Sequence, residues 1–435
     1  MFDILSFLEE KREGISHKSE DIEFFVNEFH KGKIPDYQVS AWLTSVFHKG
    51  MSQQEIKSFT LALAHSGDIV PFPRGFNAVD KHSTGGVGDK TTLIVVPLVA
   101  ASGLPVAKLS GRGLGFTGGT VDKLESIPNM NVHLSTETFL KQVERIGCAI
   151  SGHSMELAPA EGKFYALRDV TATVPSLPLI CSSIVSKKMA GGASKFVFDV
   201  KCGQGAFMQT FPEARALAQA LVSLSASLNH PSMAIISAMD QPLGEWIGNS
   251  MEVYEAIKTL QGEGPSDTEL LSLHLAGAMI VLGGKATSLE EGVAIAHENL
   301  VNGQALQKME DLIEAQEGEK KVCISPEKYL RPAKEKYTLY ASKSGFLAEL
   351  NARKIGEGVK RIGGGRTEQG DHIDLSVSVH LRAKQGDFVE KGNPIFDVYY
   401  TDNKKLQRAK PFFERSIHLV DIKPSIQNLI MEIVS

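Results

Sequence analysis

Two glycine-rich loops contain residue types that suit the binding of an anion. The first spans residues 80–89 (DKHSTGGVGD) and the second spans residues 108–120 (KLSGRGLGFTGGT). Glycine lets backbone amides approach an anion closely, and amides at the N-terminus of a helix point toward it. Lys81 and Arg112 add positive charge to these loops. The candidate hydroxyl donors are Ser83, Thr92, Ser110 and Thr120. Because each loop precedes a predicted helix, we expect both to converge on a phosphate that takes part in a reaction.

Two further side chains of these loops, His82 and Lys108, are candidates to act on a ligand. His82 lies between Lys81 and Ser83, and histidine titrates near neutral pH, so it suits a proton donor or acceptor. The competing interpretation is a packed or surface histidine. Lys108 ends a predicted strand, which would direct its ammonium at the same site, although a charged strand end in solvent is a comparable interpretation.

A second segment, residues 163–193, supplies polar side chains of another kind. Ser183 and Lys187 are four residues apart and would share one face of a helix, with Arg168 in the preceding helical stretch. Arginine offers a planar fork of donors and lysine a point charge. A hydroxyl and two cations suit a planar ligand with carbonyl oxygens. A solvated basic helix end is the alternative interpretation.

The elements around the two loops follow the order of a parallel α/β sheet. Predicted strands at residues 79–83 and 106–109 each lead into a glycine loop and then a helix, at residues 89–101 and 120–126. Ligand loops of such sheets lie at the carboxyl ends of the strands. Buried strands return at residues 193–201 and 234–238, separated by a helix over residues 214–226. The predicted fold class is therefore α/β, with a mostly parallel central sheet.

Helical periodicity defines a separate unit that the chain enters twice. Apolar spacing predicts helices over residues 2–66 and again over residues 163–193. We predict a small discontinuous helical domain formed by residues 1–67 and 163–193. The larger α/β domain, residues 68–162 and 194–335, would bind the phosphate across a cleft.

A C-terminal domain of residues 336–435 is predicted from β-rich, turn-rich sequence. The stretch at residues 386–392 (GDFVEKG) is typical of barrel-sandwich hairpins of the biotinyl and lipoyl type. No lysine stands in the usual attachment context, so we interpret this α+β barrel-sandwich-like domain as structural.

Composition excludes several function classes. The chain has 435 residues, 42% hydrophobic and 22% charged, with a net charge of −5, which is ordinary for a globular enzyme and gives no case for a nucleic-acid or membrane partner. The four cysteines form no CxxC pair, which argues against structural zinc and disulfides. The N-terminus lacks the features of a signal peptide. We expect a cytoplasmic protein.

Long sequence strings resemble the thymidine/pyrimidine-nucleoside phosphorylase family. The family string SGRGLGxTGGTxDKLES is similar to residues 110–126, which read SGRGLGFTGGTVDKLES. Residues 80–89, the LRDVTATV string at 167–174, SKK at 186–188 and QPLG at 241–244 match in the same order. The likeness extends over essentially the whole chain.

This resemblance implies reversible phosphorolysis of a pyrimidine nucleoside to the free base and a pentose 1-phosphate. It implies a homodimer that closes one domain onto the other, with inorganic phosphate as co-substrate and no organic cofactor. The phosphate ligands it implies are Lys81, Ser83, Thr92, Ser110 and Thr120, with Lys108 beside them. The base ligands it implies are Arg168, Ser183 and Lys187, with His82 at the carbonyl edge of the base. His82, Arg168 and Lys187 would stabilise the departing base.

Three positions distinguish this chain within the resemblance. Lys108 matches the pyrimidine-nucleoside branch, whereas strict thymidine phosphorylases have methionine there, so we expect uridine to be cleaved along with thymidine and deoxyuridine. Phe116 replaces a histidine usual in the second loop. Lys90 stands where some members have threonine beside a potassium ion. The other positions that match the ligands of that ion are Gly88, Leu243, Trp246 and Glu255. Potassium is therefore a hypothesis for this chain.

Three alternatives remain open at this point. A strict thymidine phosphorylase would cleave thymidine alone. A relative of anthranilate phosphoribosyltransferase would use a GTGGD-type loop with acidic residues that bind magnesium and diphosphate, whereas this chain has GGVGD. A non-catalytic nucleoside-binding protein is suggested by Phe116, and it would bind uridine or uracil without turnover.

Overall fold

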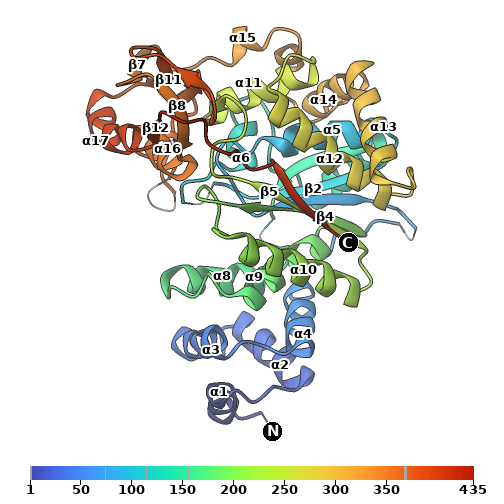
Figure 1. Ribbon diagram of the computed structural model, residues 1–435. Helices are drawn as coiled ribbons and strands as arrows, with labels where there is room; N and C mark the ends of the chain where they lie inside the picture. The colour runs from blue at the N-terminus through green and yellow to red at the C-terminus, as the bar shows by residue number, and fades with distance from the viewer. Residues whose placement is uncertain (1, 74, 114, 155, 367–369) are drawn as a thin grey trace.

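The computed structural model describes residues 2–73, 75–113, 115–154, 156–366 and 370–435. Figure 1 shows three units: helices at one end, an α/β unit in the middle, and a smaller β-rich unit on its flank. The fold class is α/β, as predicted, with a mostly parallel central sheet and an antiparallel C-terminal part.

The helical unit is assembled from two separate stretches of chain. Its first stretch contains α1 (Ile4–Glu13), α2 (Ser19–His30), α3 (Asp36–Lys49) and α4 (Gln53–Ala64). The chain returns with α8 (Pro159–Val170) and α9 (Leu177–Ala190), which pack against α2, α3 and α4.

Aromatic side chains from both stretches form the core of the helical unit. Phe164 of α8 meets Phe59 of α4 edge to face, with 5.1 Å between ring centroids, and the fully buried Trp42 lies 5.2 Å from Phe59. Buried aromatic rings contribute large apolar areas, so this core fixes α8 against the N-terminal helices. It thereby places the polar residues of α8 and α9 above the sheet.

The central sheet has six strands in the order β13-β5-β4-β1-β2-β3. Its parallel strands are β1 (Val79–Ser83), β2 (Val106–Ser110), β3 (Cys148–Gly152), β4 (Lys195–Cys202) and β5 (Ser232–Ala238). Both faces are covered, which explains the nearly continuous apolar runs of the strands. One face packs on α5 (Thr91–Ala101) and α12 (Ser266–Leu282), and the other on α10 (Phe211–Ser227).

Shorter elements complete the α/β unit. They are α6 (Thr120–Leu124), α7 (Thr136–Ile146), α11 (Asn249–Leu260), α13 (Leu289–Val301), α14 (Gln304–Ala315), a 3₁₀ turn (Lys320–Cys323) and α15 (Pro326–Tyr329). Helix α5 begins at Thr91 instead of the predicted residue 89, and it continues through the buried Pro97.

Among its described residues, the C-terminal unit contains two antiparallel sheets and two helices. One sheet has the order β10-β8-β12 and the other β6-β9-β11-β7. Their strands are β6 (Trp246–Ile247), β7 (Glu335–Tyr340), β8 (Gly345–Leu350), β9 (Ser378–Leu381), β10 (Phe388–Val389), β11 (Pro394–Tyr400) and β12 (Ile417–Val420). The helices are α16 (Ala352–Val359), which continues into a π-helical turn (Lys360–Gly364), and α17 (Asn403–Glu414).

Two strands connect the C-terminal unit with the α/β unit. β6 lies far upstream in the sequence but pairs with β9. The last strand, β13 (Ile430–Val434), pairs antiparallel with β5 and forms an edge of the central sheet. The structure therefore differs here from the predicted division, which assigned all of residues 336–435 to one separate domain.

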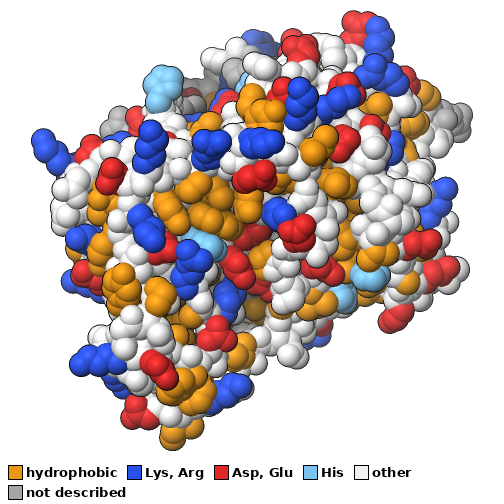
Figure 2. Space-filling view, turned by 90° about the horizontal axis from the view of Figure 1, so that it is seen from above, with side chains coloured by type: hydrophobic (Ala, Val, Ile, Leu, Met, Phe, Trp, Pro, Cys, Tyr) orange, Lys and Arg blue, Asp and Glu red, His pale blue; other side chains and the backbone are white. Residues whose placement is uncertain are grey.

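The surface has no single dominant charge on the face shown in Figure 2, where acidic and basic side chains are interspersed. Within the part of the chain that the structure describes, no helix is long and apolar enough to cross a membrane.

Candidate active site

A cavity of ≈ 670 Å³ lies where the carboxyl ends of the sheet strands face the helical unit. Its lining comes from the loops after β1 and β2, from His153 after β3, and from α8 and α9. The strand order places β1 between β2 and β4, which is the point where the connections of a doubly wound sheet diverge and ligands bind. The volume lies within the range typical of small-molecule sites.

The loop side of the cavity presents hydroxyl groups and backbone amides. Ser83, Thr92, Ser110 and Thr120 all line it. The Ser83 hydroxyl donates to Asp89 Oδ2 at 2.5 Å and accepts from the Gly85 amide at 3.2 Å. The Ser110 hydroxyl is buried and has no hydrogen-bond partner among the described residues. A buried polar group without a partner is costly, so this hydroxyl suits a ligand oxygen.

Lys81 is brought to the site but its ammonium turns away from the cavity. It donates to Thr91 Oγ1 at 2.7 Å and lies 3.3 Å from Asp199 Oδ2, and its side chain is almost fully buried. Successive side chains of a strand point to opposite faces. Lys81 pairs in register with Val197, which belongs to the core on the α5 side, whereas His82 pairs with Phe198 on the α10 side.

Asp89 is the carboxylate around which this loop is arranged. Burial alone would raise its pKa, but the ammonium groups of Lys201, Lys81 and Lys123 hold the pKa of Asp89 well below its usual range. Ionised Asp89 accepts hydrogen bonds from Ser83 and from Thr91 Oγ1. The first loop is therefore fixed by charge-assisted hydrogen bonds to a permanent anion.

Lys108 lines the cavity, but its ammonium is anchored to backbone carbonyls. It donates to the Lys81 carbonyl at 2.7 Å and to the Leu109 carbonyl at 3.2 Å. Burial and the nearby ammonium of Lys188 lower the pKa of Lys108 well below its usual value, although Asp80 opposes this shift. Of the two interpretations of Lys108, the solvated strand end is wrong because the side chain is buried.

The helical side of the cavity contains Arg168, Ser183 and Lys187 together. Glu161 of α8 accepts from the Ser183 hydroxyl at 2.5 Å and lies 3.2 Å from Lys187 Nζ. Arg168 donates to the carbonyls of Leu179 and Val174, while its Nε is buried without a partner among the described residues. These residues form a polar cluster inside the cleft, and the alternative of a solvated basic helix end is wrong.

His82 lies between the two sides of the cavity and is partly buried. Burial, followed by the ammonium groups of Lys188, Lys108 and Lys187, lowers the pKa of His82 well below its usual value. A neutral imidazole can donate one hydrogen bond and accept another. Its place in the cavity lining and its lowered pKa together suit His82 to act as a neutral hydrogen-bond donor to a ligand carbonyl.

Comparison with known proteins gives the family. Residues 75–306 match the glycosyl transferase family, a/b domain, residues 5–67 match the helical bundle domain of the same family, and residues 346–420 match the pyrimidine nucleoside phosphorylase C-terminal domain. The pyrimidine-nucleoside phosphorylase of Bacillus subtilis is 48% identical over 391 residues, which cover 89% of this chain and 90% of that protein. The protein of that name from Staphylococcus epidermidis is 44% identical over 434 residues, 99% of each. The chain belongs to the pyrimidine-nucleoside phosphorylase family.

The fold of this phosphorylase family member also resembles a more distant structure. Anthranilate phosphoribosyltransferase from Thermus thermophilus aligns with a TM-score of 0.59 over 72% of this chain and 99% of that one, at 18% identity. At this identity the likeness concerns the fold alone.

Several side chains of the phosphorylase site were not among the candidates from the sequence, and four of them have polar or aromatic groups in or beside the cavity. Glu161 holds both Ser183 and Lys187, and Tyr165 has Lys187 Nζ 5.5 Å from its ring centroid. Phe207 and His153 line the cavity, and His153 follows β3 directly. A third strand end beside those of β1 and β2 is the signal that predicts His153. Burial and the ammonium of Lys188 lower the pKa of His153 well below its usual value.

Phe116, which replaces the usual histidine of the phosphorylase loop, faces the C-terminal unit. Its ring packs against the apolar core of that unit, and the Arg353 guanidinium lies 5.1 Å from the ring centroid. It also lies 6.0 Å from the Phe207 ring. Phe116 therefore links the second loop to the C-terminal unit.

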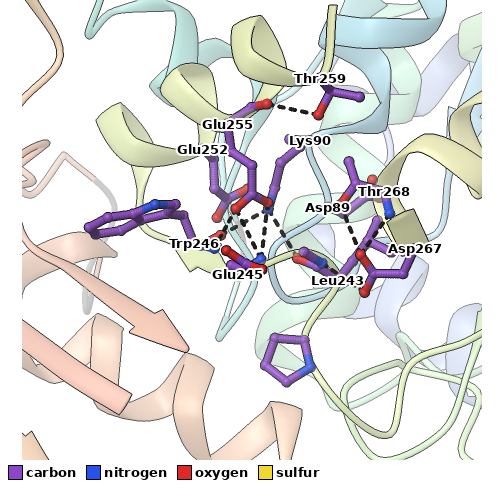
Figure 3. Close-up of polar contacts among 12 residues, drawn as sticks. Asp89, Lys90, Leu243, Glu245, Trp246, Glu252, Glu255, Thr259, Asp267 and Thr268 are labelled. Carbon is purple, nitrogen blue, oxygen red and sulfur yellow. Dashed lines mark hydrogen bonds and ion pairs between the residues drawn. The ribbon is translucent and has the colours of Figure 1, made fainter. Parts of the chain in front are cut away.

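The positions that resemble a potassium site do come together, but around an ammonium group (Figure 3). Lys90 Nζ donates to the Leu243 carbonyl at 3.0 Å, the Trp246 carbonyl at 2.9 Å and Glu255 Oε1 at 2.5 Å. Gly88 approaches the Leu243 backbone so closely that an added Cβ would clash with its carbonyl oxygen. Across the described residues, no group of three or more His, Cys, Asp and Glu side chains could hold a metal ion.

Proposed function

We propose that this chain catalyses the reversible phosphorolysis of pyrimidine nucleosides, namely uridine, thymidine and deoxyuridine, to the free base and ribose or deoxyribose 1-phosphate. One observation carries the proposal. A single cavity is lined on one side by hydroxyls and glycine-loop amides suited to phosphate, and on the other by Arg168, Ser183 and Lys187, suited to a pyrimidine. The names of the relatives at 44% and 48% identity support the same reaction.

In the proposed reaction, a phosphate oxygen forms a bond to the anomeric carbon as the bond from that carbon to the base nitrogen breaks. The electron pair leaves with the base, so negative charge develops on the pyrimidine. Arg168 and Lys187 would stabilise that charge, and neutral His82 would donate a hydrogen bond to a pyrimidine carbonyl. Donors placed in advance where charge develops typically supply ~3–4 kcal/mol each.

Phosphate would bind between the two glycine loops. Ser83, Thr92, Ser110 and Thr120 supply hydroxyls, and Thr92 lies in the first turn of α5, where the helix dipole favours an anion. We assign Lys81 and Lys108 a supporting role in this phosphate site, because both ammonium groups are held by protein oxygens and contribute long-range positive charge.

Several properties of the protein accompany this proposal. Closure of the helical unit onto the α/β unit would bring the two halves together around the substrates. We propose a homodimer by analogy with the family, and a cytoplasmic location, which the four free and buried cysteines support. The structure offers an ammonium where the hypothetical potassium ion would lie, so we propose no role for potassium in the wild-type reaction.

The experiment is a set of phosphate-dependent cleavage assays with uridine, thymidine and deoxyuridine, without added magnesium. Release of base from all three, only when phosphate is present, is the expected result. Cleavage of thymidine alone would place the chain with strict thymidine phosphorylases. A requirement for magnesium, or binding without turnover, would contradict the proposal. Lys108→Met tests substrate range, since we expect it to reduce uridine cleavage more than thymidine cleavage.

A further inference from the structure

Lys90 lies at the centre of a cage of oxygen atoms outside the substrate cavity (Figure 3). Its three acceptors lie far from Lys90 in the sequence, on the loop of residues 241–247, which includes the short strand β6, and on helix α11. The Lys90 ammonium has no solvent exposure and the Glu255 side chain only 3%. An ammonium has three N–H donors and no acceptor, so these three oxygens satisfy it completely.

The chemistry of the cage is that of a site for a hard cation. Two backbone carbonyls and one carboxylate are the oxygen ligands that such cations prefer. Glu255 also accepts from the amides of Glu245 and Trp246, which fixes its orientation. A potassium ion on the same oxygens would lie against the Lys90 ammonium, and two positive charges in contact in a buried site repel strongly. The residues present therefore do not fit a bound potassium ion.

Gly244 packs closely against the cage. Gly244 has a left-handed φ of +72°, and an added Cβ there would lie 2.7 Å from Lys90 Nζ and clash with Glu255 Oε1. The loop thus touches the ammonium directly. Lys384 of the C-terminal unit holds the same loop from another side, with donations to the Pro242 and Gly244 carbonyls at 2.7 Å and 2.8 Å.

The cage also connects to the first glycine loop. Lys90 is flanked by Asp89, which accepts from Ser83, and by Thr91, which accepts from Lys81. Thr92, the next residue, lines the substrate cavity. Any displacement of the Lys90 ammonium would therefore move the groups that face the phosphate subsite.

We propose that the Lys90 ammonium is a tethered monovalent cation, which makes this enzyme independent of potassium and positions the first phosphate loop. Lys90 is a positioning residue, because it acts on substrate through Asp89 and Thr92. The effect on phosphate rests on the proposed function, whereas cation binding does not. The cage without its ammonium should accept an external ion of similar size and charge.

The test compares the wild type with Lys90→Ala and Lys90→Met in potassium, ammonium and tetramethylammonium chloride at equal ionic strength. Alanine opens the cage, whereas methionine removes the charge but keeps most of the volume. We measure the thermal midpoint, which needs no turnover, and the KM for phosphate. Lys384→Ala is the matched control, because its side chain is 25% exposed and water can replace it.

We expect the wild-type midpoint and KM to be equal in potassium and in tetramethylammonium. Lys90→Ala should bind phosphate about tenfold or more weakly in tetramethylammonium, since it loses charged hydrogen bonds. Potassium or ammonium should restore both its midpoint and its KM, but not those of Lys90→Met. Lys384→Ala should respond equally to all three salts.

Two results would overturn the proposal. One is a wild type that is stabilised or activated by potassium specifically. The other is a Lys90→Ala protein that folds but shows no difference between the three cations in its thermal midpoint. If no variant cleaves nucleosides in any salt, the proposed function fails, and the midpoints still decide whether the cage binds a cation.

Discussion

Two adjacent lysines of α9 have opposite surroundings, and this contrast gives a sharp test of the base site. Lys187 lines the cavity with a side chain that is 26% exposed and lies 3.2 Å from Glu161. Lys188 is only 2% exposed and forms a 2.6 Å ion pair with Asp80, which is equally buried. Replacement of each by alanine removes the same ammonium from positions one residue apart. We expect Lys187→Ala to impair catalysis and Lys188→Ala to impair folding.

The magnitudes follow from these environments. Loss of one preset donor to a developing anion costs ~3–4 kcal/mol of transition-state stabilisation, which corresponds to about 10²–10³-fold in kcat/KM. Lys188→Ala leaves the buried Asp80 carboxylate without its closest cation, and the loss of one member of a buried pair costs ~3–5 kcal/mol of stability. Lys108 at 3.8 Å from Asp80 would offset part of that cost.

The assay pairs steady-state phosphorolysis of uridine with thermal unfolding of the same preparations. Lys187→Ala should lose turnover with only a small fall in its midpoint, because Lys187 is partly exposed and water can replace its ammonium beside Glu161. Lys188→Ala should unfold at a markedly lower temperature, because its partner Asp80 is buried. Lys187→Met is the control that keeps the length of the side chain without its charge, and it should match alanine. A wild-type kcat/KM in Lys187→Ala would refute the proposal that Lys187 binds the pyrimidine base. A loss of activity that is fully explained by unfolding of the variant would refute it as well.

Three further predictions concern the phosphate side and the histidine. Ser110→Ala should raise the KM for phosphate by about 10-fold or more without loss of stability, because the lost hydrogen bond is to a charged group. Ser225 is another buried serine whose hydroxyl has no partner among the described residues, and Ser225→Ala should change neither the KM for phosphate nor the stability. In the folded protein the pKa of His82 is well below its usual value, so its contribution to stability is present above its unfolded pKa of about 6.5 and falls as the pH drops below that value. His82→Gln should therefore flatten the decline of the thermal midpoint between about pH 7 and 5. An unchanged slope would show that His82 does not cause that decline. Arg366 donates from two nitrogens to the Asp122 carboxylate at 3.0 Å and 2.9 Å, and Asp122 also accepts from the Gly113 amide of the second loop. Lysine cannot form this paired contact, so Arg366→Lys should raise the KM for phosphate several-fold and leave the KM for uridine unchanged. Equal effects on both KM values would argue against a local role.

The sequence was sufficient for the central part of the fold and the composition of the site. The predicted strand at residues 79–83 coincides with β1, and both glycine loops lead into helices beside the cavity. These features depend on local patterns: glycine and hydroxyl residues between a short apolar strand and a helix. The return of the chain to the helical unit at α8 and α9 could also be predicted, because the apolar spacing of these two helices is a local pattern as well.

Features that depend on tertiary contacts were beyond such patterns. The direction of Lys81 depends on the pleat of β1, because neighbouring side chains of a strand face opposite sides, so Lys81 faces the core on the α5 side and His82 does not. The pairing of β13 with β5 joins segments far apart in the chain, and nothing in either segment specifies the partner. The Lys90 cage is another such feature, since two of its three oxygens are backbone carbonyls of a distant loop, and the residue types of that loop do not determine where its carbonyls point.

Buried carboxylates explain how an acidic protein maintains so basic a site. Asp80 pairs with Lys188, Asp199 with Lys81 and Lys201, Glu161 with Lys187, and Glu255 with Lys90. Each of these pairs places a carboxylate beside an ammonium, so that neither charge is left without a partner. The carboxylates also fix where each ammonium points, so most of these lysines have a structural role. Lys187 differs, because its ammonium lies in the cavity beside Glu161, which also accepts from Ser183. Positive charge near the substrates is therefore set by the geometry of buried anions, and not by the number of lysines that the motifs contain.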